Sequence, residues 1–156
     1  MRSPVYLKSM ISTTLIFIAL SGCAGSKPDS IGVHDNQLSS CPESPNCVSS
    51  DAQDEEHKVV HFRLRGDPQK SWAQMVEVVE SLTRTTIVTK TETYVHAECR
   101  SKLFRFVDDL ELLLNPATGI VSIRSASRLG YSDLGVNRKR YKSLRRDLLE
   151  KKIIEE

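Results

Sequence analysis

The order of hydrophobic and polar positions predicts a strand followed by an amphipathic helix in the first half of the chain. In residues 59–65 apolar side chains alternate with polar ones, which is typical of a strand buried on one face. Asp67 and Pro68 then mark a helix start, because aspartate accepts hydrogen bonds from free backbone N–H groups and proline suits the first helical position. From Trp72 to Leu82 apolar residues recur at helical spacing, which predicts that one helix face enters the core.

Four more strands are predicted in the middle of the chain. Each is rich in β-branched residues or alternates apolar with polar positions: residues 84–91, 94–101, 103–114 and 120–127. The alternation breaks once, at Asp108, which predicts a bulge in the longest strand. If residues 116–119 form a loop, the flanking strands pair antiparallel and Glu111 faces Arg124 as an oppositely charged pair.

A second amphipathic helix is predicted near the end of the chain. Asn137 is a suitable cap, and Leu144 and Leu148 then lie on one buried face. Residues 151–156 are expected to fray. The order of strands and helices, with short hairpin connections, favours the α+β class. We therefore predict a single domain, residues 41–156, with an antiparallel sheet of about five strands and two helices packed on one face.

Residues 1–22 are typical of a secretory signal peptide rather than of the domain. Arg2 and Lys8 supply positive charge, residues 10–20 form an apolar run, and Cys23 follows small residues. The order Leu-Ser-Gly-Cys resembles the lipobox of bacterial lipoproteins. This resemblance implies cleavage before Cys23 and acyl chains on that cysteine, which anchor the protein in a membrane. The alternative is an ordinary secretory signal that ends at a cysteine by chance.

Residues 23–40 are expected to link the lipid anchor to the domain as a flexible tether. They are rich in small and polar residues and show no apolar periodicity. Under the lipoprotein resemblance, Ala24 in place of an aspartate favours the outer membrane where the cell has one. The expected location is therefore the bacterial cell envelope, with the protein on the periplasmic side of the outer membrane.

The charge of the chain argues against nucleic acid as a partner. Removing residues 1–22 takes away two basic residues and no acidic one, which leaves 20 basic and 20 acidic side chains. A nucleic-acid-binding protein normally carries a basic excess. The charge is polarised, since residues 121–156 hold 10 basic and 5 acidic side chains. A solvated basic helix or an anionic partner would each account for this.

The cysteines predict one disulfide and one buried thiol. Cys41 and Cys47 enclose a loop with two prolines, and in an oxidising compartment such a pair is expected to form a disulfide. A redox or metal-binding pair is the alternative. The spacing differs from the C-x-x-C of redox sites, and no second cysteine pair completes a zinc site. Cys99 lies between Glu98 and Arg100 and is expected to face the core.

Three segments carry a family resemblance: CPESPNCVSS, HAECRSKLFRFVDDLELLL and RSASRLGYSDLGVNRKR. They look like the signature segments of the domain-of-unknown-function 1499 family, over roughly residues 40–150. The long third motif makes the resemblance specific. It implies a fold and an exported or membrane-associated location, but no reaction, because the family has no established biochemical activity. Cys99 stands where phenylalanine is usual, which fits a buried residue.

The same segments contain the candidate site. His96, Glu98 and Arg100 recur at period 2 and therefore share one face of a strand. The candidate ligand-binding residues, which combine charged and hydroxyl side chains, are His96, Glu98, Arg100, Arg105, Arg124, Arg128, Tyr131 and Asp133. No nucleophile elbow, HExxH, P-loop or dinucleotide motif is present, so no cofactor and no metal are expected.

Three interpretations of this cluster remain open. The arginines could pair with carboxylates across the strands and hold the sheet together. They could instead bind an anionic lipid headgroup or envelope glycan, because guanidinium groups form paired hydrogen bonds with phosphate or carboxylate. The protein could also be a hydrolase of such a molecule with His96 as base, which requires a hydroxyl beside its ring. An arginine that is already paired with a carboxylate is not free to bind an anion.

Overall fold

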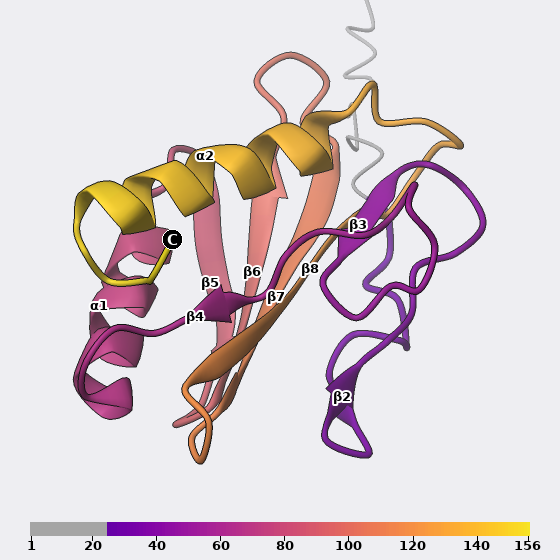
Figure 1. Ribbon diagram of the computed structural model, residues 1–156. Helices are drawn as coiled ribbons and strands as arrows, with labels where there is room; N and C mark the ends of the chain where they lie inside the picture. Colours follow the sequence, from indigo (N-terminus) through magenta and orange to yellow (C-terminus); the bar gives the residue numbers. More distant parts are fainter. Residues whose placement is uncertain (1–24) are drawn as a thin grey trace, which may run out of the picture.

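The computed structural model describes residues 25–156 and shows an α+β fold, as predicted. Figure 1 shows a twisted sheet with both helices on one side of it. A six-stranded sheet is accompanied by a separate two-stranded hairpin. The elements in chain order are β1 (Val33–His34), β2 (Gln37–Leu38), β3 (Cys47–Ser49), β4 (Phe62–Arg63), α1 (Pro68–Ser81), β5 (Thr85–Lys90), β6 (Tyr94–Arg100), β7 (Val107–Asn115), β8 (Ile120–Ser127) and α2 (Val136–Glu150).

The main sheet is antiparallel throughout, with the strand order β3-β8-β7-β6-β5. The short strand β4 also pairs with β8, beyond the end of β3. The hairpin register is the predicted one, since Leu112 lies opposite Ile123 and Glu111 lies opposite Arg124. The strand missing from the sequence prediction is β3, which follows the disulfide loop and has too few residues to show an alternating pattern.

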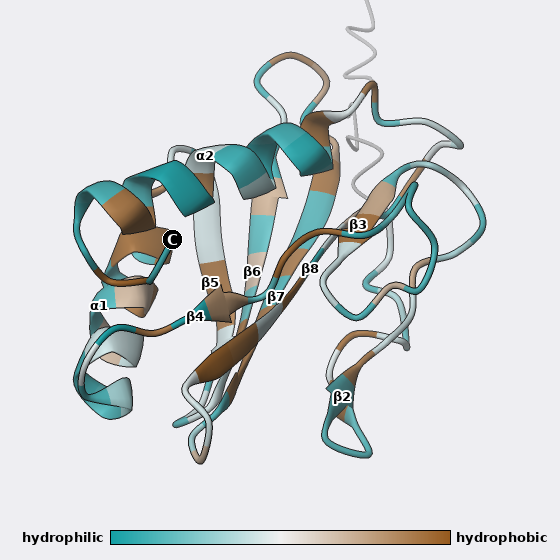
Figure 2. Ribbon diagram, in the orientation of Figure 1, coloured by the Kyte–Doolittle hydropathy of each residue, from teal (hydrophilic) through white to brown (hydrophobic). Residues whose placement is uncertain are grey.

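The helices cover one face of the sheet and bury the hydrophobic core there. On α1 the predicted stripe is buried, including Met75 and Val79, and the Asp67 side chain caps the helix by accepting from the Lys70 amide at 2.9 Å. On α2 the buried face carries Leu144 and Leu148. In Figure 2 the outward surface of α2 is hydrophilic, while the strands behind it carry hydrophobic segments. We call this the helix face and the opposite one the outer face.

The predicted strand 103–114 begins later than expected, and no bulge forms at Asp108. The register from Tyr94–Leu113 to Arg100–Val107 is continuous, so β7 starts at Val107. Residues before it form a turn instead, closed by a hydrogen bond of 2.9 Å from the Ser101 amide to the Phe106 carbonyl. Asp108 interrupts the apolar pattern for a different reason. It lies on the helix face, where its carboxylate binds Ser127 and Arg140 in a buried polar network.

Residues 59–65 and 151–156 both differ from their predicted structure. The predicted strand 59–65 is reduced to Phe62–Arg63. The amide and carbonyl of Val60 bond the Tyr141 hydroxyl instead of a strand, and the Val60 side chain is 67 % exposed. Residues 151–156 do not fray. Ile154 is buried and bridges Leu64, so the end of the chain extends the sheet region next to β4.

Residues 25–40, predicted to be a flexible tether, instead lie against the outer face. The hairpin β1–β2 forms within them, Leu38 is buried, and β2 contacts β7 and β8. Figure 1 shows β2 on the other side of the sheet from α1. The predicted signal peptide, residues 1–22, and the predicted lipidation site, Cys23, lie outside the described residues. In the described part, neither helix has the length and apolar character needed to cross a membrane.

The cysteine predictions are confirmed for the described residues. Cys41 and Cys47 form a disulfide, with their Cα atoms 5.7 Å apart. It closes the loop that leads into β3. Cys99 is a free, buried thiol in the hydrophobic core, and burial raises its pKa.

Candidate functional site

Most of the candidate residues meet on the outer face of the three central strands. We call this set the arginine network: Tyr94, His96, Glu98, Arg100, Asp109, Glu111, Arg124 and Arg128. The predicted period-2 arrangement of β6 and the register of β7 and β8 bring them together. The network contains three carboxylates and three guanidinium groups, joined in ion pairs.

Asp109 lies at the centre of one half of the network. Arg128 binds it through two parallel contacts, Nε to Oδ2 at 2.9 Å and Nη2 to Oδ1 at 2.7 Å. The same Nη2 reaches Glu98 Oε1 at 2.7 Å, and the second oxygen of Glu98 accepts from Arg100 Nη2 at 2.7 Å. His96 Nε2 is 2.7 Å from Asp109 Oδ1. This half of the network is therefore a chain of alternating positive and negative groups across the strands.

Glu111 organises the other half and ties the N-terminal segment to the sheet. Its Oε2 accepts from Arg124 Nη1 at 3.0 Å, and its Oε1 accepts from the Tyr94 hydroxyl at 2.7 Å. The same Oε1 accepts from the backbone amide of Gly32 at 2.9 Å. Glu111 is completely buried, so these three donors replace the water that a carboxylate would otherwise bind. The contact with Gly32 explains why residues 25–40 do not behave as a free tether.

Burial and pairing shift three pKa values in this network. Desolvation acts to raise the pKa of Asp109, but hydrogen bonds from Arg128 and His96 more than offset it, so its pKa is lowered. Burial and the neighbouring Glu111 carboxylate raise the pKa of Tyr94. Hydrogen bonding to Asp109 raises the pKa of Arg128 despite its desolvation. The shifts of Asp109 and Arg128 keep the carboxylate ionised and the guanidinium group protonated, which are the charge states that the ion pair requires.

The geometry of His96 does not support a catalytic base. The ring is fully buried, at 0 % exposure, and one nitrogen is held by Asp109. Its Nδ1 has no hydrogen-bond partner among the described residues, so no serine or tyrosine hydroxyl stands ready to be activated there. A groove of about 960 Å³ lies beside β4, but none of the candidate residues line it. The hydrolase interpretation therefore has no supporting geometry.

The arginine count also argues against an anion site on the outer face. Arg100, Arg124 and Arg128 each pair with a carboxylate. Because three guanidinium groups meet three carboxylates, the network holds no surplus positive charge for a ligand. Arg105 and Tyr131 are exposed and lie outside it, in the loops before β7 and after β8. In the region described, no group of three histidine, cysteine or acidic side chains is placed to hold a metal ion.

A second polar network, missed by the sequence analysis, lies on the helix face around Asn137. This residue is fully buried, and its Oδ1 accepts from Ser125 Oγ at 2.6 Å. Its Nδ2 donates to Ser127 Oγ and to the Asn46 carbonyl, both at 3.0 Å. Asn137 therefore joins α2 to β8 and to the segment that contains the disulfide. The predicted capping role is instead taken by Asp133.

Asp133 and Asp108 complete this second network. Asp133 accepts from the amides of Gly135 at 2.8 Å and Asn137 at 2.7 Å, and so caps the start of α2. Asp108 pairs with Arg140 of α2 at 2.6 Å and accepts from Ser127 Oγ at 2.6 Å. Residues 124–140 thus contribute polar side chains to the networks on both faces of the sheet. Most of these side chains connect β8 and α2 to neighbouring elements. The sequence did show a high density of hydroxyl and amide residues in this segment. Their hydrogen-bond partners, however, lie too far away in the sequence to be identified from spacing.

The fold and these two networks define a small α+β domain in which most of the polar side chains of the central strands make structural contacts. The chain belongs to the family described as "Protein of unknown function (DUF1499)", whose model matches residues 37–148. The match covers more than half of the chain and begins at β2, inside the predicted tether. The family expected from the sequence is therefore confirmed. No curated protein and no solved structure matched.

Proposed function

We propose that this protein is a lipid-anchored accessory domain of the bacterial cell envelope that binds anionic lipid headgroups. In this proposal Cys23 carries the acyl chains and the domain lies on the periplasmic side of the outer membrane, where the cell has one. The observation that carries the proposal is a set of exposed cations outside both polar networks. They are Lys102, Arg105, Lys139 and Lys142, none of which pairs with a carboxylate in the described part of the chain.

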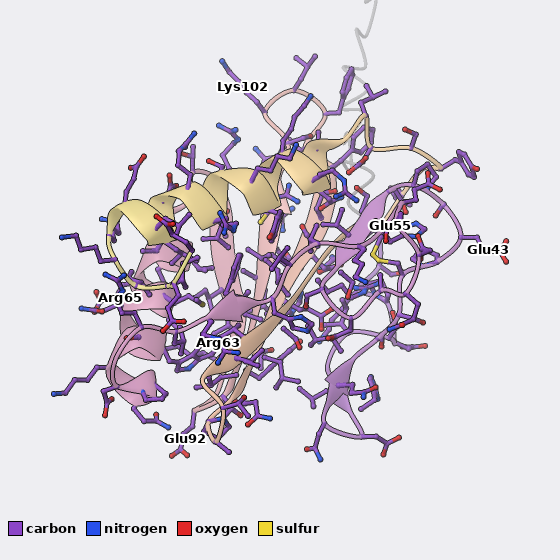
Figure 3. The ribbon with its side chains drawn as sticks, in the orientation of Figure 1. Glu43, Glu55, Arg63, Arg65, Glu92 and Lys102 are labelled. Atoms are coloured by element: carbon purple, nitrogen blue, oxygen red, sulfur yellow. A yellow bond between two sulfur atoms is a disulfide. The ribbon has the colours of Figure 1, made fainter. Side chains whose placement is uncertain are left out.

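These cations gather on one side of the molecule. Lys139 and Lys142 are three residues apart, so they share the exposed face of α2. Lys102 and Arg105 belong to the loop that joins β6 to β7, and Figure 1 shows this loop extending past α2. Figure 3 places Lys102 at the outer end of that loop. Each basic residue close to an anionic membrane contributes about 1 kcal/mol of attraction.

A lipid headgroup is favoured over a glycan because of where the described chain begins. A Cβ atom built on Gly25 would lie 2.9 Å from Arg128 Cβ, so the chain enters the fold directly beside the loop that follows β8. Cys23 is two residues before Gly25, a distance of at most about 7 Å. An anchor at Cys23 would therefore hold the loops at this end of the sheet against the bilayer surface.

Vesicle binding tests the headgroup proposal. The hydrophobic core is built between Val48 and Ile154, so a polypeptide of residues 24–156, which lacks Cys23 and therefore its acyl chains, retains it. We expect this polypeptide to sediment with phosphatidylglycerol vesicles and not with phosphatidylcholine vesicles. Neutralising Lys102 and Arg105 with glutamine removes about 2 kcal/mol of attraction, a loss of about 30-fold in affinity.

The matched control is Arg63→Gln, an exposed arginine on β4 that Figure 3 shows far from Lys102. It is expected to bind like the wild type. Equal losses in both variants, or no preference for anionic vesicles, would rule out the proposed site, and binding to envelope polysaccharide alone would favour a glycan. The anchor is tested separately, because Cys23→Ser should abolish incorporation of labelled palmitate.

A further inference from the structure

Exposed apolar side chains are concentrated in two loops at one end of the sheet. Leu103, Phe104 and Phe106 come from the loop between β6 and β7, and Leu129, Tyr131 and Leu134 come from the loop between β8 and α2. These six residues, which we call the apolar tip, are between 44 and 84 % exposed. The other exposed large apolar residues within 25–156 are valines, most of them scattered singly, as is usual for a protein surface. Clustered exposure of this kind indicates an interaction site.

The two loops form one surface. A cavity of about 190 Å³ lies between them, lined by Phe106 from the first loop and Leu129 from the second. The backbone amide of Arg128 donates to the Val107 carbonyl at 3.2 Å, which joins the bases of the loops. The rings of Phe104 and Phe106 stack with their centroids 5.6 Å apart. The apolar tip is therefore one continuous surface, in which the side chains of the two loops lie close together.

Local hydrogen bonds keep the loops in the conformation that exposes these residues. The Phe106 amide donates to Ser101 Oγ at 2.9 Å, and the Leu134 amide donates to Ser132 Oγ at 3.3 Å. Arg105 and Leu134 both have left-handed backbone angles, with φ of 56° and 54°. Such angles are unfavourable for residues with a Cβ atom, so the surrounding hydrogen bonds must hold the loops in this conformation. A leucine in this conformation points away from the domain instead of returning to its core.

We propose that the apolar tip inserts into the interfacial region of the lipid bilayer and fixes the orientation of the anchored domain. This inference rests on the proposed lipid anchor. The occupant is a membrane because the chain enters the fold at the tip, where a Cβ on Gly25 would lie 3.2 Å from Leu129 Cγ. Lys102 and Arg105 flank the apolar residues of the first loop. Aromatic and aliphatic side chains bordered by cations are the composition that binds membrane interfaces.

Tryptophan quenching by lipids brominated on their acyl chains tests the insertion directly. The chain has one tryptophan, Trp72, which is buried on α1 and serves as an internal reference. In the lipidated full protein reconstituted into such vesicles, the fluorescence of Phe104→Trp should be quenched more strongly than that of the wild type, which contains only Trp72. An interfacial residue reaches about 5–10 Å into the headgroup and acyl boundary. The wild type and a Val88→Trp control, exposed on β5, should be unaffected.

A second measurement covers the aliphatic residues. Replacing Leu103 and Leu134 by serine should weaken vesicle binding of the non-acylated polypeptide by about tenfold, because less apolar surface leaves water. Val88→Ser should leave it unchanged. Quenching in Phe104→Trp no greater than in the control would overturn insertion, even if palmitate labelling and headgroup binding persist. The inference is also overturned if the tip joins two copies, in which case the serine variants would convert a lipid-free dimer to a monomer.

Discussion

Replacing Arg128 by alanine distinguishes a structural arginine network from a ligand site. In the folded protein the guanidinium group bridges two carboxylates, Asp109 through two contacts and Glu98 through one. The side chains of Arg128 and Asp109 are only 5 % and 2 % exposed. Alanine removes the positive charge and all of these hydrogen bonds. It leaves the buried carboxylate of Asp109 close to the partly exposed carboxylate of Glu98.

The expected loss of stability follows from this geometry. Removing one partner of a buried ion pair costs about 3–5 kcal/mol, because the remaining charge is uncompensated. Asp109 keeps its contact with His96, and Glu98 keeps its contact with Arg100, so the lower part of that range applies. A loss of about 3 kcal/mol is a large share of the 5–15 kcal/mol typical of a domain. It corresponds to a fall in Tm of about 10 °C for a domain of this size.

Denaturant unfolding of the polypeptide of residues 24–156 measures this effect, with Arg146→Ala as the matched control. Arg146 lies on α2 with a side chain that is 64 % exposed, and it contacts Asp147 at 3.0 Å. Exposed ion pairs contribute little, so the control should lose less than about 0.5 kcal/mol. If the two variants unfold at the same denaturant concentration, Arg128 does not hold the sheet together. The structural account of the network would then be wrong.

Three further predictions concern buried polar and sulfur groups. Asn137→Ala should lower the free energy of unfolding by about 2–4 kcal/mol, because it leaves buried partners unsatisfied; a loss below about 0.5 kcal/mol in the same denaturant assay would show that the helix-face network contributes nothing. The pKa of Asp109 is lowered in the folded protein, so its contribution to stability is present above the unfolded pKa of about 3.9 and is lost as pH falls through the lower folded value. Urea midpoints of the wild type should therefore decrease below about pH 4 more steeply than those of Asp109→Asn, and parallel profiles would contradict this. Reducing the Cys41–Cys47 disulfide should cost about 2 kcal/mol for so short a loop, and native Cys99 should resist alkylation until the protein unfolds; mass spectrometry that finds Cys99 labelled in folded protein would contradict its burial.

The elements predicted correctly are those whose signals are local in the chain. The Asp67–Pro68 start of α1 and its apolar stripe depend on hydrogen bonds and spacings within a few turns of one helix. The Glu111–Arg124 pairing follows from the length of one hairpin loop. The disulfide loop is likewise short. In each case the interacting groups are close in sequence, so residue type and spacing were sufficient to identify them.

The candidate site was only half predictable for the same reason. Period 2 on β6 correctly placed His96, Glu98 and Arg100 on one face. Whether their charges were free or paired depended on Asp109 and Arg128, which lie 13 and 32 residues beyond His96. The grouping of Arg105 and Tyr131 with this face was a consequence of their nearness in sequence. Both belong instead to the exposed loops beyond the sheet.

The sequence by itself determined the family, the α+β class, the disulfide and the shared face of His96, Glu98 and Arg100. The tertiary structure alone decided that Glu111 is satisfied by Gly32, which lies 79 residues away in a segment that looked like a tether. It also decided that Asn137 enters the core and that the apolar residues of two separate loops share one surface. The physical reason is that burying a charge or an amide requires partners in three dimensions. Such partners leave no periodic signal in the chain, whereas helices and hairpins do.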